Sequence, residues 1–411
     1  MPGWMMWWTR CIREIYLGEI RDADILQSVR KRGFKIMSRQ TGVELLKVIA
    51  LFMIVLFHVS TTISKGVSEV LPSLSQNFFN VGVATPNTQH LIIGMFDHFG
   101  ALGNIIFFVC SFWFLSSSKG IKFNKILLML MDVWVISILF LLVIAQFEDL
   151  QVKLIIKSLF PNSFGNNWFI TCYLIIYSIH PLLNKTIDSM NQKIHASFCL
   201  ISLLLYNCFV FILGEILFSS KLIQAIVLYF FVAYIKKYTH DWIKNIKLNV
   251  TLLAVGIIGV VGMYLLTNYL GLHYSIFSNQ VLRWCSTTRN NPFMILSALA
   301  LLNLFGQMRS SSRVINYISG LSMLIYLIHE NLLFRTYTRV RIWAYILNVY
   351  GETKIVLLTV VFAIVLFVVS IAVAFIYKNS IHKLVLQMEK YVESVVTKSY
   401  EFVLGLIMKV R

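Results

Sequence analysis

Long, continuous apolar runs are the feature that most limits how this chain can fold. A helix that crosses a lipid bilayer needs about 20 mostly apolar residues. Ten segments approach that length: 43–63, 99–117, 124–146, 166–184, 195–213, 221–236, 248–270, 291–308, 314–334 and 354–377. Because the runs are continuous rather than alternating, they predict helices that satisfy their own backbone hydrogen bonds within lipid. We therefore expect an all-α integral membrane fold with about ten transmembrane helices.

Composition favours a membrane protein over a soluble domain or a nucleic-acid-binding protein. Hydrophobic residues make up 58% of the chain and charged residues 13%, against roughly 25% charged in a soluble domain. The net charge of +18 is spread over short loops without a nucleic-acid-binding module, so topology and contact with anionic lipid explain it better than nucleic acid does. The cysteines have no paired spacing, which predicts neither disulfides nor a metal site. We expect a multi-pass protein of the cytoplasmic membrane.

The distribution of Lys and Arg predicts that both termini are cytoplasmic, because cytoplasmic loops are enriched in these residues. Residues 1–36 are expected to be a cytoplasmic amphipathic segment, and 37–378 the membrane domain. Residues 379–411 have apolar side chains at helical spacing, which predicts a cytoplasmic amphipathic tail lying on the inner surface. The outer loop 335–353 carries several arginines and breaks the charge rule, which could reflect a function.

Three polar residues lie on one face of the first predicted span. Lys47 and His58 are eleven residues apart, which is within about 20° of a whole number of helical turns, and Glu44 falls within about 60° of both. Along the helix axis, Lys47 and His58 are roughly 16 Å apart. Ionisable residues inside a span are functional candidates because they are costly in lipid. The alternative interpretation assigns these residues no function: Glu44 and Lys47 form an ion pair that reaches the lipid headgroups, and His58 is a histidine that only packs against its neighbours.

Further polar residues are predicted at the depth of His58. His329 and Glu330 lie near the outer end of the ninth span, and Asn167 and Trp168 open the fourth. Each alone is more often a helix cap or an interface anchor. Their convergence at one level is the argument for a site there.

At these residues the sequence resembles the acyltransferase 3 family, integral-membrane enzymes that modify surface polysaccharides. The spacing of the three polar residues in the first span matches the family pattern, with Lys47 in place of the commoner Arg. Residues 103–115 (GNIIFFVCSFWFL), 166–184 (NNWFITCYLIIYSIHPLLN) and 326–330 (YLIHE) resemble three later family segments in the expected order. The resemblance covers about 37–378.

The resemblance implies transfer of an acyl group, with acetyl as the family expectation, from cytoplasmic acetyl-CoA to a hydroxyl of a glycan or lipid-linked oligosaccharide. A histidine can accept the hydroxyl proton near neutral pH, and His58 is the candidate base. We expect the following roles: catalytic, Glu44, Lys47, His58, His329 and Glu330; substrate-binding, Asn167, Trp168, Tyr326 and Arg335; cofactor-binding, Lys236 and Lys237. Direct transfer and a covalent acyl-histidine intermediate both remain open.

Other functions fit the same general pattern. A polysaccharide transporter or flippase also has many spans with polar intramembrane residues, but it would favour helices broken by Gly or Pro at mid-membrane, which are not evident. A polymerase of the same pathway would be expected to have a larger outer loop. A regulatory membrane protein that keeps the fold without activity is the third alternative.

Overall fold

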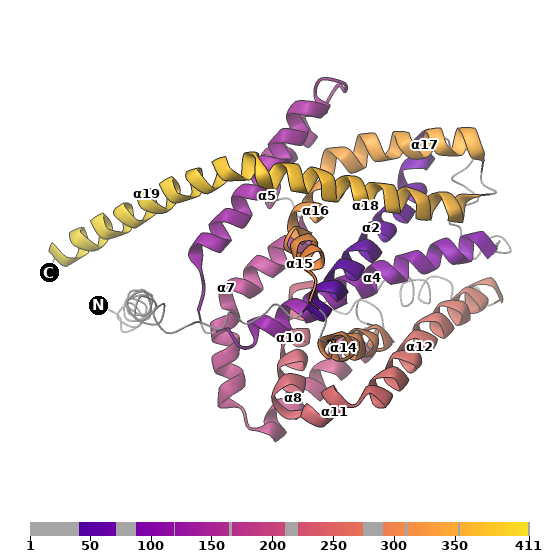
Figure 1. The fold of residues 1–411 in the computed structure, drawn as a ribbon, viewed down its shortest axis with the longest axis horizontal. Helices are drawn as coiled ribbons and strands as arrows, with labels where there is room; N and C mark the ends of the chain where they lie inside the picture. Colours follow the sequence, from indigo (N-terminus) through magenta and orange to yellow (C-terminus); the bar gives the residue numbers. More distant parts are fainter. Residues whose placement is uncertain are drawn as a thin grey trace. The chain divides into compact units, whose positions relative to one another are not determined.

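The computed structural model describes residues 41–70, 88–118, 120–163, 167–209, 221–273, 291–308, 311–351 and 354–409. Every regular element in these ranges is helical (Figure 1). The expected all-α fold is therefore confirmed. The expected segment 1–36 lies outside the described residues, and the orientation of the termini remains a prediction.

Five helices are long and apolar enough to cross a membrane, among the residues described. They are α2 (Thr41–Val70), α4 (Thr88–Leu115), α5 (Phe123–Ile144), α12 (Ile246–His273) and α18 (Ile355–Asn379). The other five predicted spans correspond to shorter or less apolar helices, so the count of ten remains a prediction. These are α7 (Trp168–Ser189), α8 (Gln192–Leu203) with the π-helical η1 (Leu204–Phe209), α10 (Lys221–Tyr238), α14 (Pro292–Gly306), and the pair α15 (Arg313–Gly320) and α16 (Ser322–His329). The remaining elements are α6 (Val152–Leu159), α11 (His240–Lys244), η3 (Phe334–Thr338), α17 (Arg339–Tyr350) and α19 (Ile381–Lys409).

Helix α2 is central to the packing of the membrane domain. It contacts α4, α14, α15, α16, α17 and α18, and it lies beside α4 along much of its length (Figure 1). Two glycines of α4 permit this close approach: a Cβ at Gly103 would lie 2.7 Å from the Ala50 carbonyl oxygen, and one at Gly100 would collide with Phe57. Small residues allow helix backbones to come together in a membrane. Since Phe57 precedes His58, this contact helps to place the candidate base.

The predicted ninth span, 314–334, differs from expectation because it is two helices rather than one. Helix α15 ends at Gly320 and α16 begins at Ser322. Glycine favours a helix end because it has a high conformational entropy to lose, and the Ser322 hydroxyl bonds the Ser319 carbonyl oxygen at 2.6 Å across the break. Because of this break, the polar residues Ser319 and His329 belong to different helices.

The predicted outer loop 335–353 is mostly helical rather than an open loop. It forms η3 and α17, and Trp343 on α17 is completely buried. The Trp343 indole donates to the carbonyl oxygen of Val59 at 3.0 Å, and its ring packs edge-on against Phe362 of α18. A tryptophan side chain that is both buried and hydrogen-bonded holds its own helix against the elements that it contacts. The connection is thereby held against α2 next to His58.

Helix α19 begins beside α5 and α18 and is joined to them by a buried polar cluster. Asp132 of α5 accepts hydrogen bonds from the Tyr377 hydroxyl and from His382 Nδ1, both at 2.8 Å. All three side chains are buried. A carboxylate within an apolar helix is costly unless it is hydrogen-bonded. These bonds satisfy Asp132 and attach the start of the tail helix to the membrane domain.

Candidate active site

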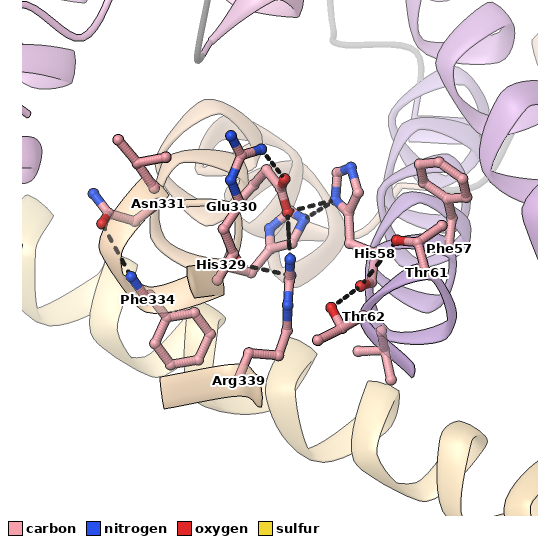
Figure 2. Close-up of polar contacts among 12 residues, drawn as sticks. Phe57, His58, Thr61, Thr62, His329, Glu330, Asn331, Phe334 and Arg339 are labelled. Atoms are coloured by element: carbon pink, nitrogen blue, oxygen red, sulfur yellow. Dashed lines mark hydrogen bonds and ion pairs between the residues drawn. The ribbon is translucent and has the colours of Figure 1, made fainter. Parts of the chain in front are cut away.

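The structure brings His58, His329 and Glu330 together at the meeting point of α2 and α16 (Figure 2). His58 Nδ1 lies 3.1 Å from His329 Nε2 and 3.2 Å from Glu330 Oε2. His329 is completely buried and Glu330 nearly so, while 12% of the His58 side chain is accessible. Of the two histidines, the one with some accessible side-chain surface is thus His58, the residue proposed from sequence as the base.

The hydrogen bonds indicate which nitrogen of each ring carries the proton. His329 Nδ1 lies 2.7 Å from the Ile325 carbonyl oxygen, which can only accept, so Nδ1 of His329 donates. Nε2 of a neutral His329 is then an acceptor facing His58 Nδ1. The Glu330 carboxylate is also close enough to His58 Nδ1 to accept a hydrogen bond from that nitrogen. His58 therefore holds its proton on Nδ1 and presents an unprotonated Nε2, the arrangement that a general base requires.

Two arginines hold the Glu330 carboxylate from its other sides. Arg335 Nη1 donates to Oε1 at 2.7 Å, and Arg339 donates to Oε2 from both Nη1 and Nη2 at 3.1 Å. Arg339 also reaches the His329 carbonyl oxygen at 3.2 Å. Charge-assisted bonds of this kind orient a carboxylate strongly. The position of Glu330 beside His58 is thus set by residues from η3 and α17.

Arg339 is part of this cluster although its role is not evident in the sequence. Its side chain is 4% exposed, against 33% for Arg335. The excess of arginine in segment 335–353 is the one signal that could have indicated it. Arg335, expected to bind substrate, makes a bond with Glu330 and keeps part of its guanidinium accessible.

Tyr326 connects this cluster with the start of α7. Its ring centroid lies 6.3 Å from that of His58, 5.7 Å from that of His329 and 5.7 Å from that of Phe169. Phe169 follows Asn167 and Trp168, the two residues expected at the same depth. The structure therefore joins the late histidine segment to the beginning of α7 through aromatic contacts.

His58, His329 and Glu330 are also the described residues whose spacing would allow a metal ion to bind. Their ligand atoms lie within 4.8 Å of one another, and two histidines with a carboxylate are a common zinc set. However, both oxygens of Glu330 are engaged by guanidinium groups. Two positive charges at the carboxylate oppose a divalent cation there. The donor set therefore fits proton transfer better than metal binding.

Glu44 and Lys47 form a separate cluster about three to four turns from His58 along α2. Lys47 Nζ is 3.4 Å from Glu44 Oε2 and lies 5.2 Å from the centroid of the Phe114 ring. Glu44 is buried and also accepts a hydrogen bond from the Ser319 hydroxyl of α15. Ser319 is a member of this cluster that sequence reasoning missed. Both this cluster and the His58 cluster include residues of α2. None of the hydrogen bonds and ion pairs described here joins one cluster to the other.

The two lysines expected to bind a cofactor differ in their surroundings. Lys236 Nζ donates to the Trp113 carbonyl oxygen and lies 5.0 Å from that ring centroid. Trp113 adjoins Phe114, so Lys236 and Lys47 contact consecutive residues at the end of α4. Lys237 instead lies 3.6 Å from the exposed carboxylate of Asp188. Of the two lysines, Lys236 is thus the one that contacts the end of α4, where Lys47 also lies.

The start of α7 contains Asn167 and Trp168, the remaining candidates. Asn167 is buried at the N-cap position, but its side chain does not cap the helix. It lines a small pocket together with Lys157 and Asn331. The Trp168 ring is half-buried and lies 4.5 Å from Lys221 Nζ. Asn167 therefore lies beside Asn331, the residue that follows Glu330, whereas Trp168 lies beside Lys221 of α10.

Comparison with known proteins identifies one family. A family model described as an acyltransferase domain, that of the acyltransferase 3 family, matches residues 40–378. A search of curated proteins finds no significant match, and neither does a search of solved structures. The matched range includes every candidate residue described above.

Proposed function

The chain belongs to the acyltransferase 3 family, and from this premise we propose that it transfers an acetyl group from cytoplasmic acetyl-CoA to a hydroxyl of a surface or exported polysaccharide. In this proposal His58 is the general base. The family assignment favours acyl transfer over transport or polymerisation of the glycan. The membrane that contains the protein is proposed to be the cytoplasmic membrane.

The observation that carries this proposal is the hydrogen-bond pattern around His58. Nδ1 donates toward His329 and Glu330, so Nε2 is the His58 nitrogen that carries the lone pair. In the proposed reaction, Nε2 takes the proton of the acceptor hydroxyl while that oxygen attacks the thioester carbonyl. The carbon–sulfur bond then breaks, and the protonated His58 returns its proton to the departing CoA sulfur. During transfer the Glu330 carboxylate, 3.2 Å away, stabilises the positive imidazolium.

The other cluster on α2 supports a place for the donor. Lys47 and Lys236 lie next to neighbouring aromatic residues at the end of α4. Ammonium groups bind phosphate as point charges, and the phosphates of CoA are the negative groups of the donor. We propose that the nucleotide part of CoA binds there and that its thioester extends along α2 toward His58.

The decisive experiment measures ester-linked acyl groups on the surface glycan of cells that lack the protein. Cells complemented with the wild-type chain should recover these groups, and cells carrying His58→Ala should not, at equal protein abundance. His240→Ala, which changes an exposed histidine of α11, is the matched control and should restore acylation. Normal acylation in cells that carry His58→Ala would refute the proposal that His58 is the general base. Loss of the glycan itself on deletion would indicate transport or polymerisation instead.

A second measurement separates direct transfer from an acyl-histidine intermediate. Purified protein is mixed with radiolabelled acetyl-CoA in the absence of acceptor, and label bound to protein is counted after rapid denaturation. Direct transfer predicts no label above that of the His58→Ala variant. Label that requires His58 and passes to added acceptor would establish the covalent route.

A further inference from the structure

Helix α17 is bonded to both segments that carry the proposed reaction, the turn of α2 with His58 and the end of α16. Arg339 and Trp343 are four residues apart, so they lie on the same face of this helix. Arg339 donates to Glu330 Oε2 from both Nη1 and Nη2 at 3.1 Å (Figure 2). Trp343 Nε1 donates at 3.0 Å to the carbonyl oxygen of Val59, the residue after His58. One turn of α17 thus joins the two segments.

The hydrogen bond from Trp343 is additional to the bonds that α2 needs as a helix. Because α2 continues to Val70, the Val59 carbonyl oxygen already accepts from the backbone N–H four residues later. The Trp343 side chain is completely buried, and the N–H of a buried indole usually has an acceptor, which Val59 supplies. The bond therefore fixes where α17 lies on α2, and α2 does not require it in order to be helical.

Two successive carbonyl oxygens in the His58 turn of α2 accept hydrogen bonds from side chains. The carbonyl oxygen of His58 accepts from the Thr62 hydroxyl at 2.7 Å, a bond within α2 (Figure 2). The carbonyl oxygen of Val59 accepts from Trp343, which belongs to another helix. A bond within one helix moves with that helix, whereas a bond between helices resists rotation or sliding of one against the other. Trp343 therefore holds the His58 turn in place relative to α17.

Packing keeps Trp343 in this position. Its ring centroid lies 5.6 Å from that of Phe362 of α18, at an interplanar angle of 71°. Trp343, Val59 and Leu347 belong to one cluster of buried hydrophobic side chains, and close-packed side chains have little room to shift. Arg339, one turn earlier on α17, is also buried. The face of α17 that carries Trp343 and Arg339 is thus a rigid part of the fold.

The separation of His58 and Glu330 determines how strongly the carboxylate stabilises the imidazolium. Glu330 Oε2 and His58 Nδ1 are 3.2 Å apart, although they come from distant parts of the chain. Electrostatic attraction falls with distance, and a displacement of about 1 Å at a reacting group can slow a reaction about 100-fold. A helix that is bonded to both segments therefore contributes to the rate through their relative position.

We propose that Trp343 is a positioning residue for the proposed base. Together with Arg339 on the same face of α17, it holds the His58 turn of α2 at the distance from Glu330 at which the carboxylate stabilises the imidazolium. This inference rests on the proposed function and deepens it, because it gives a role in the reaction to the connection 335–353, which stood out in the sequence only for its arginines. Trp343 acts through His58, so its loss should slow the chemical step and leave substrate binding unchanged.

The first test measures transfer of radiolabelled acetyl from acetyl-CoA to the surface glycan, de-esterified beforehand with mild base, by the purified full-length chain. Trp343→Phe keeps an aromatic ring and removes the N–H donor. It should lower kcat roughly five- to twentyfold and leave the KM for each substrate within about twofold. Trp242→Phe is the matched control, because Trp242 Nε1 is buried and has no hydrogen-bond partner within the described part of the chain. Equal effects of the two substitutions on kcat would overturn the proposal.

A second variant separates the hydrogen bond from the packing of the ring, and it serves where Trp343→Phe folds poorly. Benzothienylalanine in place of Trp343 has the shape of tryptophan with sulfur instead of the N–H group, so it removes the donor alone. We expect kcat to fall roughly threefold or more while the melting temperature stays close to that of wild type. A kcat equal to that of wild type would overturn the proposal.

The combination of Trp343→Phe with Glu330→Gln gives a readout that a purely structural role would not change. Once the charge at Glu330 is removed, its distance from His58 matters less, so Trp343→Phe should lower kcat by less than about twofold in the Glu330→Gln background. The same factor in both backgrounds would overturn the proposal, because Trp343 would then support only the fold. Wild-type protein that transfers no acetyl group would overturn the proposed function as well, whereas a normal wild-type rate without loss in Trp343→Phe would overturn the positioning role alone.

Discussion

Replacing Glu330 by Gln tests the electrostatic part of the mechanism. The change keeps the shape of the side chain and removes the negative charge 3.2 Å from His58 Nδ1. At that distance, an effective dielectric constant of about 20 gives an attraction of about 5 kcal/mol between the carboxylate and an imidazolium. The two guanidiniums that share the carboxylate oppose it, and we take about half the attraction as the net value. A loss of about 2–3 kcal/mol in the transition state is roughly a 30- to 150-fold decrease in kcat.

The assay is initial-rate transfer of radiolabelled acetyl from acetyl-CoA to the de-esterified glycan by the purified protein. Glu148→Gln is the matched control, because it removes a carboxylate from an arginine pair whose Arg341 is 66% exposed. We expect this control to stay within about twofold of wild type, since exposed ion pairs contribute little. If Glu330→Gln remains within threefold of wild type, or Glu148→Gln loses as much, the electrostatic reasoning is wrong.

A stability effect must be separated from the effect on the reaction. Glu330→Gln leaves two guanidiniums without their carboxylate, and breaking a buried ion pair costs about 3–5 kcal/mol. The double variant Glu330→Gln with Arg339→Gln removes the excess charge, so thermal stability should recover in part. The rate of acyl transfer should not recover, because the carboxylate beside His58 is still missing. Recovery of both together would mean that Glu330 acts only through the fold.

Three further outcomes can be measured with the same purified protein. Lys47→Ala should slow transfer more than Lys47→Arg, because arginine keeps a positive charge beside Glu44; equal losses would exclude a role for that charge. Lys236→Gln should raise the KM for acetyl-CoA, whereas Lys237→Gln should change it less than about twofold because its pair with a carboxylate is exposed; the reverse order would contradict the placement of the donor. Asp132→Leu should lower thermal stability by about 1–3 kcal/mol, because two buried donors lose their acceptor, and an unchanged melting temperature would count against that role.

The apolar runs of the sequence predicted much of the fold, and the resemblance of four segments predicted the membership of the family. The apolar runs predicted helices, and the spacing of Lys47 and His58 within one run placed both on α2. The predicted depth of His329 and Glu330 in the ninth span added these two residues, and the structure brings them into contact with His58. These features are readable because helical period and segment order are local properties of a chain.

The remaining features depend on tertiary contacts that no local pattern encodes. The sequence suggested that two histidines share a depth, but the bond from His329 to the Ile325 carbonyl oxygen, which decides the protonated nitrogen, appears only in three dimensions. Arg339 lies nine residues after Glu330, with a π-helical segment between them, so a regular helical spacing would not have paired them. Lys236 and Lys237 are neighbours with the same chemistry, and only packing against Trp113 distinguishes them.

The arrangement of charge along α2 gives a reason for placing a histidine, rather than a permanent ion, at the reacting position. A charged side chain in the bilayer costs several kcal/mol unless it is paired, and the described structure pairs Glu44 with Lys47 and Glu330 with arginines. In the proposed mechanism His58 is neutral before the reaction, so it does not carry the free-energy cost of a charged side chain in the bilayer. It becomes charged only during transfer, when the carboxylate that stabilises it is already held in place. The energy needed to orient Glu330 is then supplied by folding, through the bonds to Arg335 and Arg339, and not by the reaction.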